Sequence, residues 1–198
     1  MRNHSGGVKL KKETKKELIR RAAVEVIAEN GFYITTISQI AAAADISVGT
    51  IYNYFEKKEE ILEYIFKIEL KKRISYIEEI RKKDISFWNK LKIFLEFHFS
   101  ELTENLAVAK ILVREKEFPR TEHSGDISNY MFKISDEIEN MIQQAAQEDK
   151  LKIDHTEVIA ALIFGGIQGI VEKGIKNNDP ELFKNAPEEI IKLLKKGI

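Results

Sequence analysis

The amino-acid sequence predicts an all-α protein of about nine helices. Ile, Leu, Ala, Glu and Lys make up the bulk of the 198 residues, with only 10 Gly and 3 Pro, and all of the five except Ile favour helix. Apolar residues recur at helical spacing in nearly every segment, and no segment alternates over a convincing strand length. With 43% hydrophobic residues, the chain has ample material for a buried core.

Four helices are expected in the first part of the chain. The first carries its apolar face on Leu18, Ala22 and Val26, and Asn30-Gly31 is a typical C-terminal signal. The next three run from Thr36 to about Ala43, from a cap at Ser47 to about Asn53, and from Lys58 to about Arg81.

Five further helices complete the expected fold. They run from a cap at Asp84 or Ser86 to about Leu102, from Glu104 to about Glu117 with Pro119 as the stop, from Ile127 to Asp149 after the loop TEHSGD, from Thr156 to Lys176, and from Pro187 to Lys196 with proline in the first turn.

The second and third helices have the spacing of a helix-turn-helix. Ala41 is small where two helix backbones would meet, Asp45 tolerates a left-handed turn, and Ile51 can pack back onto the first helix. The stretch around them is almost uncharged. An ordinary helical hairpin is the alternative reading of the same pattern.

Charge and spacing divide the chain into three parts. Residues 1–13 form a basic arm, 14–58 the helix-turn-helix domain, and 59–198 a larger helical domain. Eight Lys/Arg and two Glu lie between Met1 and Arg21, although the whole chain is neutral. A basic end on a neutral protein favours a polyanionic partner at that end, with a solubilising tail as the alternative.

The stretch GFYITTISQIAAAADISVGTIYNYFEKKEEIL, preceded by AAVEVIAEN, resembles the DNA-binding domain of the TetR family of bacterial regulators. The match covers about Thr14 to Arg73, and Asp45 replaces the glycine usual at the turn. The resemblance implies a repressor that binds a palindromic operator on double-stranded DNA as a homodimer. It also implies phosphate contacts from Thr36, Ser47, Tyr52, Tyr54 and Lys58, with Val48, Thr50 and Asn53 toward the bases. Gly49 is expected in the same DNA-binding surface, where its small size lets the backbone approach the DNA.

Individual side chains refine this expectation. The amide of Asn53 can pair with an adenine edge, and Val48 can meet a thymine methyl where the family often has Lys or Arg. Tyr52 has the alternative of partial burial against the first helix.

Two late helices are expected to form the dimer interface. The seventh has a heptad-like seam, and the eighth is apolar nearly all round, with Gly165, Gly166 and Gly169 allowing close backbone approach. A four-helix interface between two copies satisfies both helices. Its expected residues are Ile138, Met141, Ala145, Leu162, Gly165 and Gly169. A purely intramolecular bundle is the alternative, and the last helix could cover either surface.

The fourth to seventh helices are expected to enclose a hydrophobic effector. The expected pocket residues are Trp88, Leu91, Phe94, His98 and Arg114. His98 has the alternative of a hydrogen-bonded core residue, and Arg114 that of pairing with a local carboxylate. The DNA-binding half most resembles the fatty-acid-degradation repressors, which implies a long-chain acyl-CoA effector. An aromatic or cationic multidrug compound is the alternative.

The sequence gives no support for an enzyme. It has no cysteine, its four histidines lack metal-ligand spacing, and it has no phosphate loop or nucleophile elbow. We therefore expect no cofactor and no metal. A DNA binder without a ligand is disfavoured by the large second domain. The sequence has no apolar signal segment, and its longest apolar run, Val158 to Val171, is short for a membrane span, so a cytoplasmic protein is expected.

Overall fold

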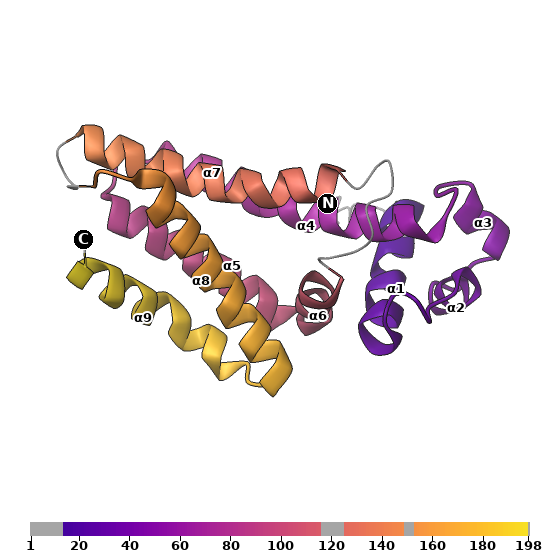
Figure 1. Cartoon of the computed structure of the whole chain (residues 1–198). Helices are drawn as coiled ribbons and strands as arrows, with labels where there is room; N and C mark the ends of the chain where they lie inside the picture. The colour runs from indigo at the N-terminus through magenta and orange to yellow at the C-terminus, as the bar shows by residue number, and fades with distance from the viewer. Residues whose placement is uncertain (1–13, 116–124, 149–152, 198) are drawn as a thin grey trace, which may run out of the picture.

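The computed structural model describes residues 14–115, 125–148 and 153–197, and the described residues form helices joined by turns and loops. The helices are α1 (Lys15–Asn30), α2 (Ile37–Ala43), α3 (Val48–Tyr52), α4 (Lys58–Arg81), α5 (Phe87–Glu104), α6 (Leu106–Arg114), α7 (Gly125–Gln147), α8 (Thr156–Asn177) and α9 (Glu181–Gly197). Figure 1 shows α1 to α3 at one end, with α4 running from them alongside α7. The expected all-α fold is confirmed.

Local hydrogen bonds explain the helix-turn-helix. Thr36 and Gln39 form a reciprocal capping box at the start of α2. At the end of α2, Asp45 has a left-handed φ of 51°. Its N–H donates to the Ala42 carbonyl and the Ile46 N–H to the Ala41 carbonyl, which is the Schellman pattern. Asp45 thus fills the role predicted for it in the turn.

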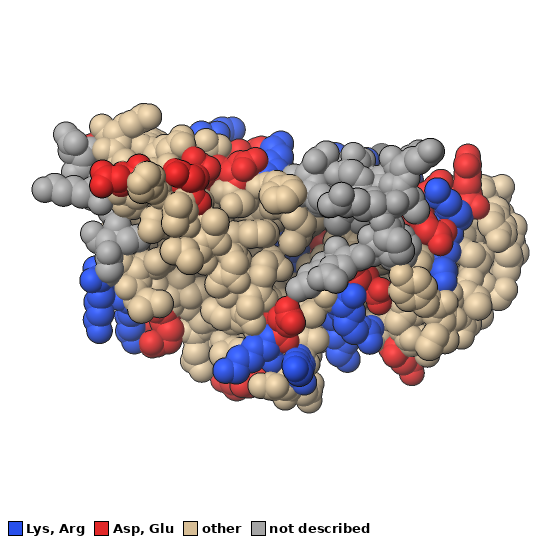
Figure 2. Space-filling view, viewed as in Figure 1, with Lys and Arg blue, Asp and Glu red and all other residues tan. Residues whose placement is uncertain are grey.

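The faces of α7 and α8 correct the predicted dimer interface. Ile138, Met141 and Ala145 are buried within the protomer, where α7 packs against α4 and α8. The heptad-like seam of α7 therefore faces its own core, and these three residues are not available to a second copy. The face of α8 that carries Leu162, 65% exposed, is open to solvent, and Figure 2 shows an uncharged area over this helix.

Three of the glycines of α8, Gly165, Gly166 and Gly169, lie on that open face. A Cβ added at Gly165, Gly166 or Gly169 would meet no other atom within 4 Å. By length and composition, α8 could cross a membrane, and 28% of its apolar window is buried in the protein. The expectation was based on the run from Val158 to Val171, which is shorter than the whole helix, and a single helix of this kind is weak evidence for a membrane span.

The last helix begins earlier than predicted. Asn178 adopts a left-handed φ of 52° and ends α8, and α9 begins at Glu181 with Pro187 inside it. Proline is typical of a first turn, which explains the misplaced start. The longer helix brings Phe183 against Gly174, where a Cβ would come within 2.4 Å of the Phe183 ring. This buried contact fixes the first turns of α9 on α8.

Candidate DNA-binding surface and ligand cavity

The outer surface of α3 is exposed and uncharged. Val48, Tyr52 and Tyr54 are 37%, 54% and 42% exposed, so Tyr52 is not buried against α1. A Cβ at Gly49 would meet only the Ser47 hydroxyl oxygen, at an ordinary 3.8 Å. The fold itself therefore does not require glycine at position 49. Because Gly49 has no side chain, nothing projects from the surface between Val48 and Thr50.

The hydroxyl groups predicted to contact phosphate already cap the helices. The Thr36 hydroxyl donates to the Gln39 side chain and accepts from the Gln39 N–H. The Ser47 oxygen accepts from the Thr50 N–H at 3.1 Å and lies 2.9 Å from the Thr50 hydroxyl. These residues hold the starts of α2 and α3 in place, while Asn53 is exposed at the C-cap of α3.

Lys58 occupies a different place from the one predicted. Its Nζ donates to the carbonyls of Phe32 and Thr35 at 2.7 Å each, and to that of Tyr33 at 3.3 Å. It also lies 4.4 Å from the centre of the Phe32 ring. Three carbonyls thus hold this ammonium against the turn between α1 and α2, which leaves it turned toward the protein instead of toward a phosphate. The basic arm, residues 1–13, lies outside the described residues.

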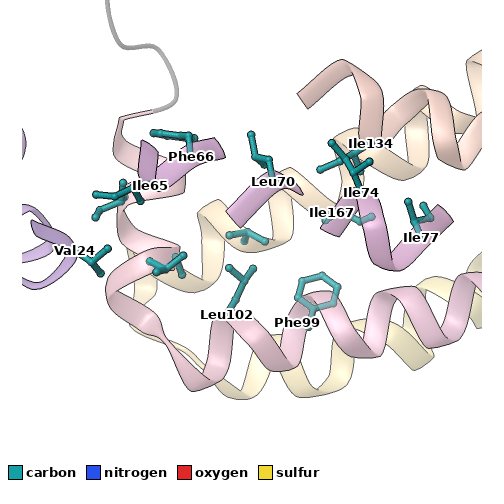
Figure 3. Packing of buried hydrophobic residues seen from close by; sticks show 14 of the residues in the cluster. Val24, Ile65, Phe66, Leu70, Ile74, Ile77, Phe99, Leu102, Ile134 and Ile167 are labelled. Carbon is teal, nitrogen blue, oxygen red and sulfur yellow. The ribbon is translucent and has the colours of Figure 1, made fainter. Parts of the chain in front are cut away.

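An apolar cavity lies inside the larger domain, among α4, α5, α6, α7 and α8. Its volume is about 20 Å³, roughly the room of one water molecule. Its apolar lining is Leu70, Phe94, Leu102, Leu112, Val113, Met131, Ile134, Phe164, Ile167 and Val171. Leu70, Leu102, Ile134 and Ile167 approach one another from four helices in Figure 3. Arg73, His98 and Gln168 are the polar residues of the described lining.

Two of the five predicted pocket residues, Phe94 and His98, line this cavity. Leu91 is buried in the core outside the lining, and Trp88 packs edge-on against Phe87 near the start of α5. Arg114 lies at the other end of the domain. Its Nη2 donates to the carbonyls of Ile27 and Ala28 at 3.0 and 2.6 Å, so it joins the end of α6 to the end of α1.

A chain of ion pairs, partly buried at Glu17 and Arg20 and buried at Glu69 and Arg73, links the DNA-binding domain to the cavity. Arg20 of α1 lies between Glu17 and Glu69, with its Nη1 3.2 Å from Glu69 Oε1. The other Glu69 oxygen is 3.1 Å from Nη1 of Arg73, one turn further along α4. Arg73 Nε then donates to Nδ1 of His98 on α5 at 3.2 Å. The network therefore spans α1, α4 and α5 and ends in the cavity lining.

The buried end of this network keeps two donors without an acceptor. Arg73 is 1% exposed and His98 6%. Burial lowers the pKa of His98 well below its usual value of 6.5, and the positive charge of Arg73 lowers it further. His98 is thus neutral, and because Nδ1 accepts from Arg73, its proton lies on Nε2. Within the described part of the chain, no group accepts from His98 Nε2 or Arg73 Nη2.

Sequence reasoning missed Glu69, Arg73 and Gln168. A usable signal was present for the first two, since an acid and a base four residues apart interrupt the apolar stripe of α4. Such a pair on a buried face indicates a buried ion pair. No group of three or more His, Asp or Glu in the described ranges is placed to hold a metal.

The capped helix-turn-helix and the separate cavity domain define the class, a helix-turn-helix transcription regulator. Residues 19–65 match the family model described as bacterial regulatory proteins, tetR family. The chain is 32% identical over 182 residues to the fatty acid metabolism regulator protein of Bacillus subtilis (strain 168), covering 89% of this chain and 92% of that protein. The chain belongs to the TetR family of transcription regulators, and its relatives are regulators and not enzymes.

Solved structures agree over nearly the whole chain. The transcriptional regulator FadR from Bacillus subtilis, in complex with stearoyl-CoA, aligns with a TM-score of 0.85 at 30% identity, covering 93% of this chain and all of that one. The fatty acid degradation regulator FadR from Bacillus halodurans aligns with a TM-score of 0.80 at 26% identity, covering 92% and 97%. The likeness therefore extends from the DNA-binding end through the cavity domain.

Proposed function

We propose that this protein is a homodimeric repressor that binds a palindromic operator and is released by a fatty acyl ligand, as an acyl-CoA ester. The observation that carries the proposal is the apolar cavity beside α4, the helix that begins next to α3. An apolar wall favours an aliphatic ligand over a polar metabolite, because burying polar groups without partners costs several kcal/mol. The likeness to a regulator bound to stearoyl-CoA supports the same ligand class.

The size of the cavity suggests how the ligand would act. A space of about 20 Å³ cannot hold an acyl chain unless the lining helices move apart. α4 supplies Leu70 and Arg73 to the lining, and its Glu69 pairs with Arg20 of α1. We infer that opening the cavity shifts α4 and, through it, α1 to α3, so that the ligand favours a state in which the two α3 helices no longer fit the operator.

The dimer interface proposed is the open face of α8, with Leu162, Gly165 and Gly169. Exposed apolar and glycine residues on one helix suit close approach of a second copy. Leu162→Arg should convert the dimer to monomers and abolish operator binding, measured by sedimentation and gel shift. Leu193→Arg is the matched control, because Leu193 is an exposed leucine on α9. Dimers of unchanged affinity in the Leu162 variant would place the interface elsewhere.

The ligand is tested by a gel-shift titration on an operator selected from random DNA. Acyl-CoA esters of increasing chain length are compared with free CoA and a cationic dye. Release that strengthens with chain length supports the acyl ligand, since each buried methylene contributes about 0.8 kcal/mol. Release by the dye alone would favour the multidrug alternative and defeat the acyl reading.

A further inference from the structure

The cavity wall carries two N–H donors without an acceptor in the described residues, Arg73 Nη2 and His98 Nε2, in otherwise apolar surroundings. We propose that Arg73 Nη2, oriented by Glu69 and His98, donates to the carbonyl oxygen of a neutral acyl group, such as a thioester, whose aliphatic chain lies along the apolar wall. This inference rests on the proposed function and names the part of the ligand that the cavity recognises.

Hydrogen bonds within the protein determine which donors are left. Arg73 Nη1 donates to the Glu69 carbonyl at 2.7 Å and to Glu69 Oε2 at 3.1 Å, and Nε donates to His98 Nδ1. Glu69 and His98 thus orient the guanidinium from two sides. What remains is Arg73 Nη2 and His98 Nε2. A carbonyl oxygen can accept from Arg73 Nη2, which would remove the cost of a buried guanidinium donor without a partner. The two imidazole nitrogens point away from each other, so His98 Nδ1 orients the guanidinium while His98 Nε2 does not share the same oxygen.

Charge decides between a neutral carbonyl and a carboxylate. Glu17, Arg20, Glu69 and Arg73 alternate in sign along the network, so its formal charge is zero. His98 adds none, because burial and Arg73 lower its pKa and keep it neutral. A fatty acid carboxylate would bring an uncompensated negative charge into this buried site, which is strongly unfavourable. A thioester carbonyl brings an acceptor and no charge.

The test compares two ligands that differ at the carbonyl. Stearoyl-CoA has a thioester oxygen, whereas S-octadecyl-CoA replaces the carbonyl with a methylene and keeps the chain length and the CoA. Binding of each to the full-length protein is measured by calorimetry below micelle-forming concentrations. The wild-type protein should bind the thioether about 10- to 100-fold more weakly, because the buried Arg73 donor then stays without an acceptor.

Two variants test whether Arg73 and His98 cause the preference for the thioester over the thioether. Arg73→Lys keeps a charge beside Glu69 but lacks the guanidinium fork, and His98→Phe keeps the ring but lacks both nitrogens. In each, the ratio of the two affinities should fall toward one. The ratio is taken on one preparation, so partial loss of folded protein cancels. Arg81→Lys is the control, since Arg81 lies on the same helix, pairs with Glu137 at 3.2 Å, and should keep the wild-type ratio.

The outcomes separate this inference from the proposed function. Equal binding of thioester and thioether by the wild-type protein would overturn the carbonyl site while the acyl ligand stands. Binding of neither ligand would overturn both. Tighter binding of stearate than of stearoyl-CoA would overturn the neutral carbonyl, and a wild-type ratio in the Arg73 and His98 variants would show that other groups hold the oxygen.

Discussion

Polar side chains have hydrogen-bond partners within the protein at the DNA-binding end, whereas two in the cavity keep donors without a partner among the described residues. At the DNA-binding end, Thr36, Ser47 and Lys58 carry groups suited to phosphate, yet all three bind the protein's own backbone or caps. In the cavity, Arg73 and His98 are almost fully buried, yet each keeps an N–H donor without an acceptor in the described part of the chain. The role of a polar residue therefore follows from the partners that the fold gives it and not from its type or its exposure.

The largest effect is expected at the centre of the buried network. Glu69→Ala leaves Arg73 and Arg20 without the carboxylate they share, and removing one partner of a buried pair costs about 3–5 kcal/mol of unfolding free energy. Urea unfolding measures the loss. Glu101→Ala is the control, because Glu101 pairs with Lys72, which is 49% exposed, and such pairs contribute under about 1 kcal/mol. Similar losses of unfolding free energy in both variants would show that the buried network contributes no more to stability than an exposed ion pair.

Lys58→Ala should destabilise the protein by about 2 kcal/mol, since a charged donor to several carbonyls is lost. DNA binding by the folded fraction should keep its dependence on salt, because no phosphate contact is removed. Thermal unfolding and salt-dependent anisotropy measure the two effects. Lys57→Ala is the matched control, as Lys57 is exposed and makes no side-chain cap. If stability were unchanged and the affinity for DNA depended less on salt, Lys58 would be a phosphate contact after all.

Asn53→Ala tests an exposed residue of the DNA-binding end, in contrast to the held side chain of Lys58. Its side chain lies at the end of α3, open to solvent, so stability should change little. Discrimination at one base position in each half-site should fall by about 1–3 kcal/mol, the worth of an amide that pairs with an adenine edge. Binding to a set of single-base operator variants measures this. An unchanged base preference at every position would remove Asn53 from base reading.

Short-range signals could be predicted from the sequence, whereas long-range partners could not. The caps at Thr36 and Ser47 and the turn at Asp45 depend on residues within a few positions, and the structure has all three. The Lys58 contacts join residues more than twenty positions apart, and no local pattern specifies them. The apolar seam of α7 can be recognised in the sequence. The sequence does not show which helix covers that seam, because the answer depends on where α4 lies in the fold.

The smallest effect concerns His98 and the pH dependence of stability. Burial, followed by the charge of Arg73, lowers the pKa of His98 well below 6.5 in the folded protein, whereas the unfolded chain titrates near 6.5. Between these two values the unfolded state binds more protons, so stability is complete above about pH 6.5 and is lost as the pH falls.

The expected slope is at most about 1.4 kcal/mol per pH unit. Glu69 and Arg73, the charged groups of the network nearest to His98, are both buried and paired, and other carboxylates also titrate toward lower pH. The measurement is therefore the difference in urea unfolding between the wild-type protein and His98→Gln from pH 7.5 to 5.5. The variant has no imidazole, so its stability should fall less across this range. Parallel curves would mean that His98 is protonated as easily in the folded protein as in the unfolded chain, and its Nδ1 could then not accept the Arg73 hydrogen bond.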